Sequence, residues 1–186
     1  MFRLFAALSL PEDVRRRLEM LRGGLPGARW QSAEQMHLTL RFIGEVDGAA
    51  FAEIMDALAD IEADAFSLAL EGVGHFPTRG RVRILWAGVA PNPALMRLRE
   101  RTEAVITGLG FEPDGRNYAP HVTLARFASR VPAHRLQEFV SYHGSFSSGP
   151  FEVRSFELFS SHLGAGGAHY AVEASYPLLA APLADT

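Results

Sequence analysis

Two short patterns in this chain place a histidine two positions before a threonine. The first pairs His37 with Thr39, and the second pairs His121 with Thr123. Given the number of histidines and threonines, chance supplies about 0.2 such patterns, so finding two exceeds the background for short motifs. An imidazole can move a proton near neutral pH, and a hydroxyl can donate a hydrogen bond to an anionic oxygen. The pair of patterns therefore indicates acid–base chemistry on a phosphate ester.

Strand geometry predicts how the two patterns present these groups. Both patterns alternate as β-strands do, and side chains two positions apart on a strand share a face. By this rule His37 and Thr39 share their face with Arg41, whereas Phe42 points into the core. The same rule turns Arg126 to the core side of the second strand unless that strand bends or ends there. We therefore expect Arg41 to be better placed than Arg126 to contact a phosphate.

Two such strands facing each other across a cleft would put an imidazole on either side of a bound phosphodiester. One neutral histidine would take a proton from the attacking water, and one protonated histidine would give a proton to the leaving oxygen. The threonine hydroxyls would donate to the non-bridging phosphate oxygens, where negative charge grows. Spacing does not say whether His37 or His121 is the donor.

Other interpretations of the same residues compete with this one. Each pattern could be ordinary strand sequence, although their joint occurrence argues against it. A metal site on His37 and His121 is disfavoured, because neither pattern contains a carboxylate and no third histidine lies at a spacing typical of metal ligands. A non-catalytic binder of RNA ends or nucleotides would use the same cleft. Trp30 and Tyr118 are candidates either to stack on a nucleobase or to pack at the edge of the core.

Composition excludes several other mechanisms. The chain has no cysteine, and its eighteen basic residues are all arginine. Thiolate nucleophiles, lysine Schiff bases and a ligase working through lysyl-AMP are therefore ruled out. The formal net charge of −3 argues against a protein that coats nucleic acid, so any RNA contact should be local.

The elements that must position these residues alternate between strands and helices. Strands are predicted at residues 2–10, 36–43, 66–73, 82–89, 121–127, 151–159 and 170–176. Helices are predicted at residues 11–21, 49–61, 93–109 and 133–140. Because no helix carries a second apolar stripe, we expect a monomer.

Loops and ends complete this picture. Residues 75–80 are dense in turn formers and predict the loop of a hairpin, and the glycine-rich residues 164–167 predict a second hairpin turn. The apolar start of the chain is too short to cross a membrane and is expected to be a strand, so a cytoplasmic location is the default. The length fits one domain over residues 1–186, with 179–186 as a loose tail.

At this point the sequence resembles the two-histidine (2H) phosphoesterases, and among them the RNA 2',3'-cyclic phosphodiesterases formerly called 2'-5' RNA ligases. The resemblance covers nearly the whole chain and rests on long segments in the same order. These segments are the first strand, Arg29-Trp30, residues 37–44, 85–88 and 120–126, and the residues 161–164 and 167–170 of the last hairpin. One departure is Ser160, because the family often has an arginine there.

The resemblance implies an α+β fold of two pseudo-symmetric lobes of antiparallel sheet, with outer helices around a central cleft. It also implies hydrolysis of a terminal 2',3'-cyclic phosphate of RNA, or of a small cyclic nucleotide, to a 2'-phosphomonoester. His37 would be the proton donor and His121 the acceptor, without metal or cofactor. A weak, ATP-independent 2'-5' joining of RNA ends by reversal is implied as well. The resemblance makes Arg126 a candidate phosphate contact beside Thr39 and Thr123.

Overall fold

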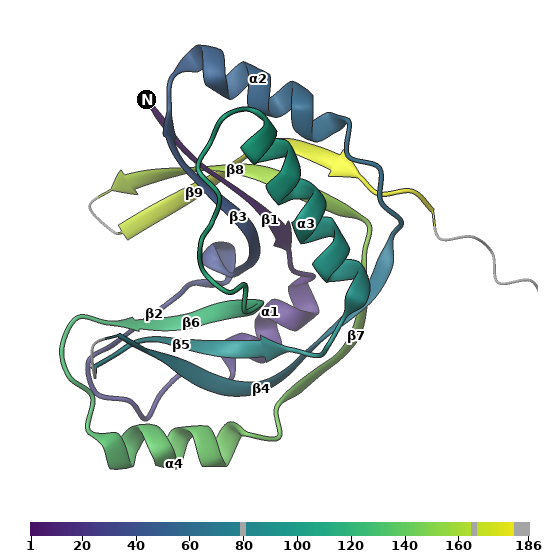
Figure 1. Ribbon diagram of the computed structural model, residues 1–186. Coiled ribbons are helices and arrows are strands. Elements are labelled where there is room, and N and C mark those ends of the chain that lie inside the picture. Colours follow the sequence, from purple (N-terminus) through teal and green to yellow (C-terminus); the bar gives the residue numbers. More distant parts are fainter. Residues whose placement is uncertain (79–80, 165–166, 181–186) are drawn as a thin grey trace, which may run out of the picture.

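A computed structural model describes residues 1–78, 81–164 and 167–180 of the chain (Figure 1). The strands are β1 (Phe2–Ser9), β2 (Ala28–Trp30), β3 (His37–Val46), β4 (Phe66–Thr78), β5 (Arg81–Val89), β6 (His121–Phe127), β7 (Ser147–Val153), β8 (Ser155–Gly164) and β9 (Gly167–Pro177). The helices are α1 (Glu12–Glu19), α2 (Gly48–Ala59), α3 (Pro93–Gly108) and α4 (Ala133–His143), with a 3-10 turn, η1 (Ala33–Gln35). No helix in these ranges is long and apolar enough to cross a bilayer.

The strands form one antiparallel, strongly curled sheet in the order β7-β4-β5-β6-β3-β1-β8-β9, and β2 pairs with the last residues of β6. The two halves of this sheet meet where β3 runs beside β6, in the middle of the molecule (Figure 1). A single register pair, Leu38 opposite Val122, joins them. Each of these residues directly follows the histidine of its motif, so the join brings the two motifs together.

The two halves exchange a strand. The chain runs β1-α1-β3-α2-β4 and then repeats a similar order as β5-α3-β6-α4-β8. Yet β4, from the first run, pairs with β5 of the second, and β8, from the second run, pairs with β1 of the first. Neither half is therefore built from one continuous stretch of chain.

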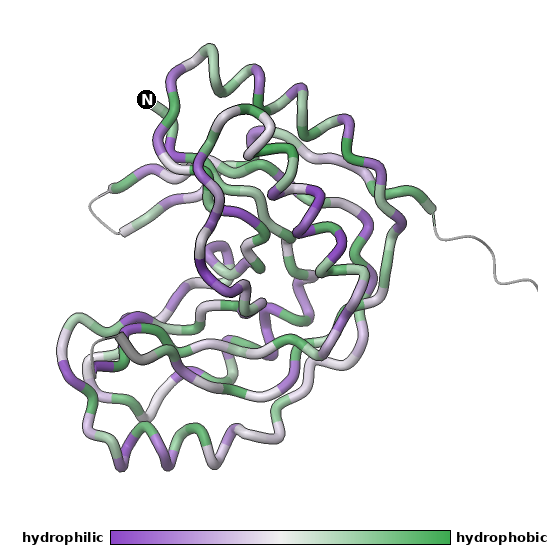
Figure 2. The backbone as a smooth tube through the Cα atoms, in the orientation of Figure 1, coloured by the Kyte–Doolittle hydropathy of each residue, from purple (hydrophilic) through white to green (hydrophobic). Residues whose placement is uncertain are grey.

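Helices cover the outer surfaces of the curled sheet. Helices α2 and α3 lie over the half that contains β3 and β1, and α4 lies under the half that contains β4 and β5 (Figure 1). Hydrophilic and hydrophobic residues alternate along α2 and α4, as expected for helices with one face on the core and the other in solvent (Figure 2). Helix α2 begins at an N-cap, Asp47, whose side chain accepts from the Ala50 backbone N–H.

One continuous cluster of buried apolar side chains runs through both halves. It includes Leu38 and Leu40 behind the first motif and Val122 and Leu124 behind the second, all at most 2% exposed. A smaller cluster lies on the other face of β1, where Phe5 packs against Phe159. Burying a large aliphatic side chain contributes roughly 1.5–3 kcal/mol, so the backs of both motif strands are firmly anchored.

The sequence predicted the fold class, and the structure confirms it as α+β, with two similar halves of antiparallel sheet and helices outside. Both predicted hairpins form, β4-β5 and β8-β9. The predicted loop at residues 75–80 is wrong for its described part, because β4 continues to Thr78 and β5 begins at Arg81.

Two further expectations need correction. The single strand predicted at residues 151–159 is two strands separated at Arg154, since β7 pairs with β4 and β8 pairs with β1. The tail does not begin at Leu179, whose backbone N–H donates to Ala63 and whose carbonyl accepts from Ala65. Residues 181–186 of the predicted tail lie outside the described residues.

Candidate active site

The two His-x-Thr motifs line one cleft between the halves of the sheet. His37 and Thr39 reach it from β3, and His121 and Thr123 reach it from β6. The cavity has a volume of about 340 Å³. Its other walls are formed by Arg3, Phe5, Gln31, Gln35, Phe42, Ile84, Arg126, Ser161, Leu163, Ala168 and Tyr170. Both motifs therefore converge on one cleft, as predicted from the sequence.

Both imidazoles are oriented by the same contact. Nδ1 of His37 lies 2.8 Å from the carbonyl oxygen of Gln35, and Nδ1 of His121 lies 2.7 Å from that of Ala119, in each case two residues upstream. A carbonyl oxygen only accepts, so each Nδ1 carries the hydrogen, and this assigns the tautomer. Nε2 of each neutral ring is then free to take up a proton.

Aromatic side chains hold the first imidazole in place. The His37 ring packs 4.7 Å from the Phe5 ring and meets the Tyr170 ring edge to face at 5.1 Å, measured between centroids. These partners belong to β1 and β9, and Phe159 of β8 stacks on Phe5 behind them. His37 therefore depends on strands from both ends of the chain.

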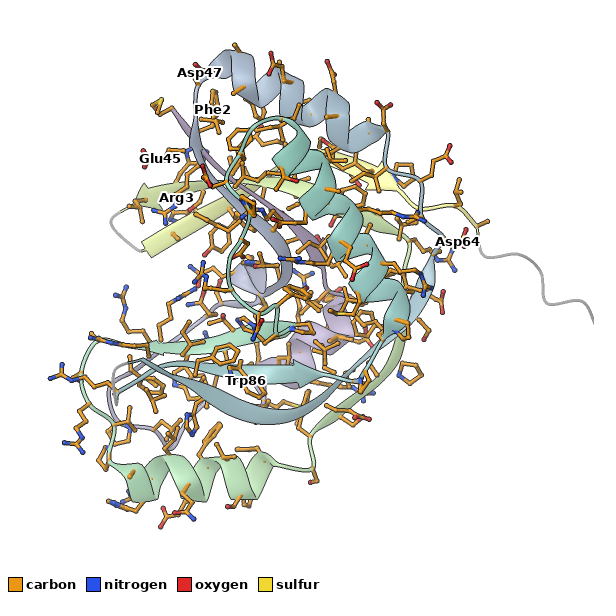
Figure 3. The ribbon with its side chains drawn as sticks, in the orientation of Figure 1. Phe2, Arg3, Glu45, Asp47, Asp64 and Trp86 are labelled. Carbon is orange, nitrogen blue, oxygen red and sulfur yellow. The ribbon has the colours of Figure 1, made fainter. Side chains whose placement is uncertain are left out.

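The second imidazole is supported by a shorter stack. Phe76 of β4 meets His121 edge to face at 4.8 Å and packs 5.4 Å from Trp86 of β5. The Trp86 ring lies against Gly74, so close that a Cβ there would come within 2.3 Å of it. Arg3 and Trp86 lie in opposite halves of the molecule (Figure 3).

Burial and nearby positive charge favour the neutral form of both histidines. Burial lowers the pKa of His37 to about 4, helped by the charges of Arg126 and His121 and opposed by the Gln35 carbonyl. Burial also lowers the pKa of His121, again with help from Arg126 and against the Ala119 carbonyl. In the free protein at neutral pH, both Nε2 atoms are thus proton acceptors.

A β-bulge in each motif strand reverses the expected direction of the residues that follow. Ala6 pairs with Arg41 and Ala7 with Thr39, so Leu40 is an extra residue on β3. In the same way Leu124 is extra on β6, where Leu85 pairs with Ala125 and Trp86 with Thr123. After one extra residue the alternation of side chains changes face.

The predictions for the two arginines and for Phe42 were therefore wrong in direction. Phe42 is not in the core: it lines the cleft, is 38% exposed and lies 5.1 Å from the Arg3 guanidinium. Arg126, five residues after His121 as Phe42 is five after His37, also lines the cleft. Arg41 does not share the face of His37, and it lies on the opposite side of β3, 7% exposed.

Arg41 instead joins β3 to the segment that leads into the second motif. Its Nε lies 2.9 Å from a Glu103 carboxylate oxygen, without the alignment of a hydrogen bond, and its Nη2 donates to the Glu112 carbonyl. The other Glu103 oxygen accepts from the Asp114 backbone N–H at 2.9 Å. The Arg41 charge thus holds the turn after α3 in place and is not directed at a ligand in the cleft.

Tyr118 belongs to the same connection and is not available to stack on a base. Its hydroxyl donates to the Thr39 carbonyl at 2.9 Å, and the Arg99 guanidinium lies 5.1 Å over its ring. Burial raises the pKa of Tyr118 strongly, so the phenol stays protonated as a donor. Trp30 packs on Phe139 of α4, so of the two aromatics considered for stacking, neither lines the cleft.

Several residues of the cleft were not singled out from the sequence. Gln35 caps η1 with Ser32, and its side-chain amide donates to the Ala168 carbonyl of β9 at 2.7 Å. Arg3 and Tyr170 lie in segments that carry the family resemblance, but neither was predicted as a site residue, and Gln31 carried no motif. Ser160, where the family often has an arginine, is fully buried and donates to Glu173, so the cationic residues of this cleft come from β1 and β6 instead.

Comparison with known proteins finds one family twice along the chain. The family model described as LigT like Phosphoesterase matches residues 8–86 and again residues 88–170, and each match contains one His-x-Thr motif. The chain belongs to this family. Among solved structures, E. coli LigT in complex with 3'-AMP superposes on this LigT-like phosphoesterase with a TM-score of 0.79, at 26% identity, covering 95% of this chain and 98% of that one.

Curated relatives extend the family assignment. A protein of Aeropyrum pernix named RNA 2',3'-cyclic phosphodiesterase is 40% identical over 140 residues, which are 74% of this chain and 78% of that protein. One of Archaeoglobus fulgidus with the same name is 32% identical over 171 residues, 90% of this chain and 96% of the relative. The predicted membership of the 2H phosphoesterases is confirmed.

Replacing Arg41 by Met should destabilise the protein by roughly 1–3 kcal/mol, because the buried Glu103 carboxylate loses one of its two arginine partners and keeps only Arg99, 3.4 Å away. The free energy of unfolding from urea denaturation measures this. Arg16→Met, which removes an exposed ion pair, is the control and should change little. An R41M protein as stable as the wild type would contradict the role assigned to Arg41.

Arg126→Gln should raise the pKa of both His37 and His121, because it removes a positive charge that opposes their protonation. Titration of the imidazole C–H resonances by NMR, from pH 8 down to about 3.5, would detect this. Arg101→Gln, on the exposed side of α3, should leave both values unaltered. A lowered or unmoved pKa in R126Q would show that Arg126 does not face the imidazoles.

Gly74→Ala should lower stability by roughly 1–3 kcal/mol, because the added methyl overlaps the Trp86 ring. Trp86 fluorescence, recorded in a Trp30→Phe background, should change with it. Gly108→Ala, where a Cβ meets nothing within 4 Å, is the matched control. Trp86→Leu should recover part of the loss in the Gly74→Ala protein, and a failure to recover any would argue against this contact.

Proposed function

We propose that this chain hydrolyses the 2',3'-cyclic phosphate at the end of an RNA to a 2'-phosphomonoester, with His37 as proton donor and His121 as proton acceptor. The observation that carries the proposal is the matched presentation of two imidazoles in one cleft, each with Nδ1 bonded to a backbone carbonyl and Nε2 left free. Relatives that carry the name RNA 2',3'-cyclic phosphodiesterase support the choice of substrate.

In the proposed reaction, Nε2 of His121 takes a proton from water as the water oxygen bonds to phosphorus. The bond from phosphorus to the 3' oxygen breaks, and Nε2–H of His37 gives its proton to that oxygen. The Thr39 and Thr123 hydroxyls and Arg126 stabilise the negative charge on the non-bridging oxygens. No other group is needed to balance the step.

The lowered pKa of His37 makes its protonation depend on the substrate. In the free protein burial, with a smaller contribution from the Arg126 charge, keeps this ring neutral at pH 7. A bound phosphate brings a negative charge that offsets Arg126 and stabilises the imidazolium. Free His37 would therefore gain its proton as the cyclic phosphate enters the cleft.

The same reaction run in reverse would join RNA ends weakly, without ATP.

The direct test is an oligoribonucleotide ending in a 2',3'-cyclic phosphate, incubated with EDTA-treated protein. We expect conversion to a 2'-phosphate, with His37→Ala and His121→Ala slower by a factor on the order of 100 or more. The control His134→Ala, exposed on α4, should keep wild-type activity.

The pH profile of kcat/KM should be bell-shaped with a maximum below pH 6.5, because both histidine pKa values are lowered.

A phosphodiester with an activated leaving group, such as a nitrophenyl ester, tests the two roles. Such a leaving group needs no proton, so it should restore activity to His37→Ala but not to His121→Ala. The opposite result would exchange the roles.

Tight binding without turnover by the wild type would favour the alternative function, a non-catalytic binder of RNA ends. Activity that returns only with added metal would contradict two-histidine catalysis. The monomeric state and cytoplasmic location expected from the sequence remain part of this proposal.

A further inference from the structure

Two arginines lie directly opposite each other at the edge of the cleft. The short strand β2 pairs with β6 so that Arg29 faces Arg126. Gln31, two residues after Arg29, lines the cleft, whereas Trp30 points the other way and packs on Phe139 of α4. By alternation Arg29 lies on the cleft face of β2, on the same side as Arg126.

This arrangement is unfavourable without an anion. Directly opposite residues on antiparallel strands have Cβ atoms about 5 Å apart, and like charges there destabilise the sheet. Both side chains are exposed, and within the part of the chain that the structure describes neither forms an ion pair with a carboxylate. Bound phosphate would relieve the repulsion, and two guanidinium groups can each bind it through paired N–H donors.

The position of Arg29 suits a second phosphate rather than the reacting one. The reacting group lies between His37 and His121, beside Thr123. Arg126 is three residues further along β6, which at about 3.3 Å per residue is roughly 7–10 Å away, less the bulge. Arg29 lies opposite Arg126 on β2, at the same level along β6. The separation from Thr123 is about the length of one nucleotide.

We propose that Arg29, together with Arg126, binds the phosphodiester on the 5' side of the terminal nucleotide, so that the preferred substrate is an RNA chain and not a nucleoside cyclic phosphate. The identity of the reacting end rests on the function proposed above. Arg126 serves both phosphates, and Arg29 serves only the second. The net charge of −3 agrees with such local recognition, because the chain as a whole does not attract nucleic acid.

The test compares two substrates that differ by that phosphodiester: adenosine 2',3'-cyclic phosphate and the dinucleotide ApA ending in a 2',3'-cyclic phosphate. Arg29→Gln should raise KM for the dinucleotide by about tenfold more than KM for the mononucleotide, with kcat for the dinucleotide changed little, since one charge-assisted contact to phosphate is lost. Arg29→Lys should restore part of the difference. Arg101→Gln should leave KM for both substrates at the wild-type value. Equal effects of Arg29→Gln on the two substrates, or none on either, would overturn the proposal.

A binding measurement separates this proposal from the proposed reaction. The product oligonucleotide, ending in a 2'-phosphate, is titrated against wild-type, Arg29→Gln and Arg101→Gln proteins at several salt concentrations. Loss of one phosphate contact should reduce the slope of log K against log salt by about 0.7 in Arg29→Gln alone. Turnover with an unchanged slope would reject the second phosphate site and keep the reaction. A reduced slope without turnover would keep the site and reject the reaction.

Discussion

The geometry of the cleft depends on one short contact between two strands. Leu38 and Val122 form the only register pair between β3 and β6 in the described residues, and both side chains are fully buried. Each is the residue after a motif histidine, so the pair lies at the centre of the pseudo-symmetry. Two imidazoles on neighbouring strands can face one substrate because their buried neighbours cannot move apart without opening the core.

Burial then determines the chemistry of these imidazoles. The aromatic rings around His37 bury it and make the charged ring costly, while the Gln35 carbonyl fixes which nitrogen carries the hydrogen. His121 has a lighter cover of Phe76 and a matching carbonyl. The two motifs are alike in sequence but their surroundings differ, and the proposed division of roles between an acid and a base rests on that difference.

The motif residues were predictable because their spacing is local. A histidine and a threonine two apart share a face whatever the rest of the strand does, and the apolar residues between them had to be buried. Arg41 and Arg126 could not be placed in the same way, because the bulges at Leu40 and Leu124 have no sequence signature and each reverses the alternation. Arg3, Phe5 and Tyr170 were also beyond reach, since they meet the motifs only through pairing between distant parts of the chain.

That long-range pairing has a consequence for how the protein is made. The first motif is encoded early, but His37 packs on Tyr170 of β9, and β1 pairs with β8 about 150 residues downstream. During synthesis β1 lacks its outer neighbour β8 until residues 155–164 have emerged. Contacts of such large sequence separation form slowly and leave strand edges exposed in the meantime. The half of the cleft that appears first in translation is therefore the last to be completed.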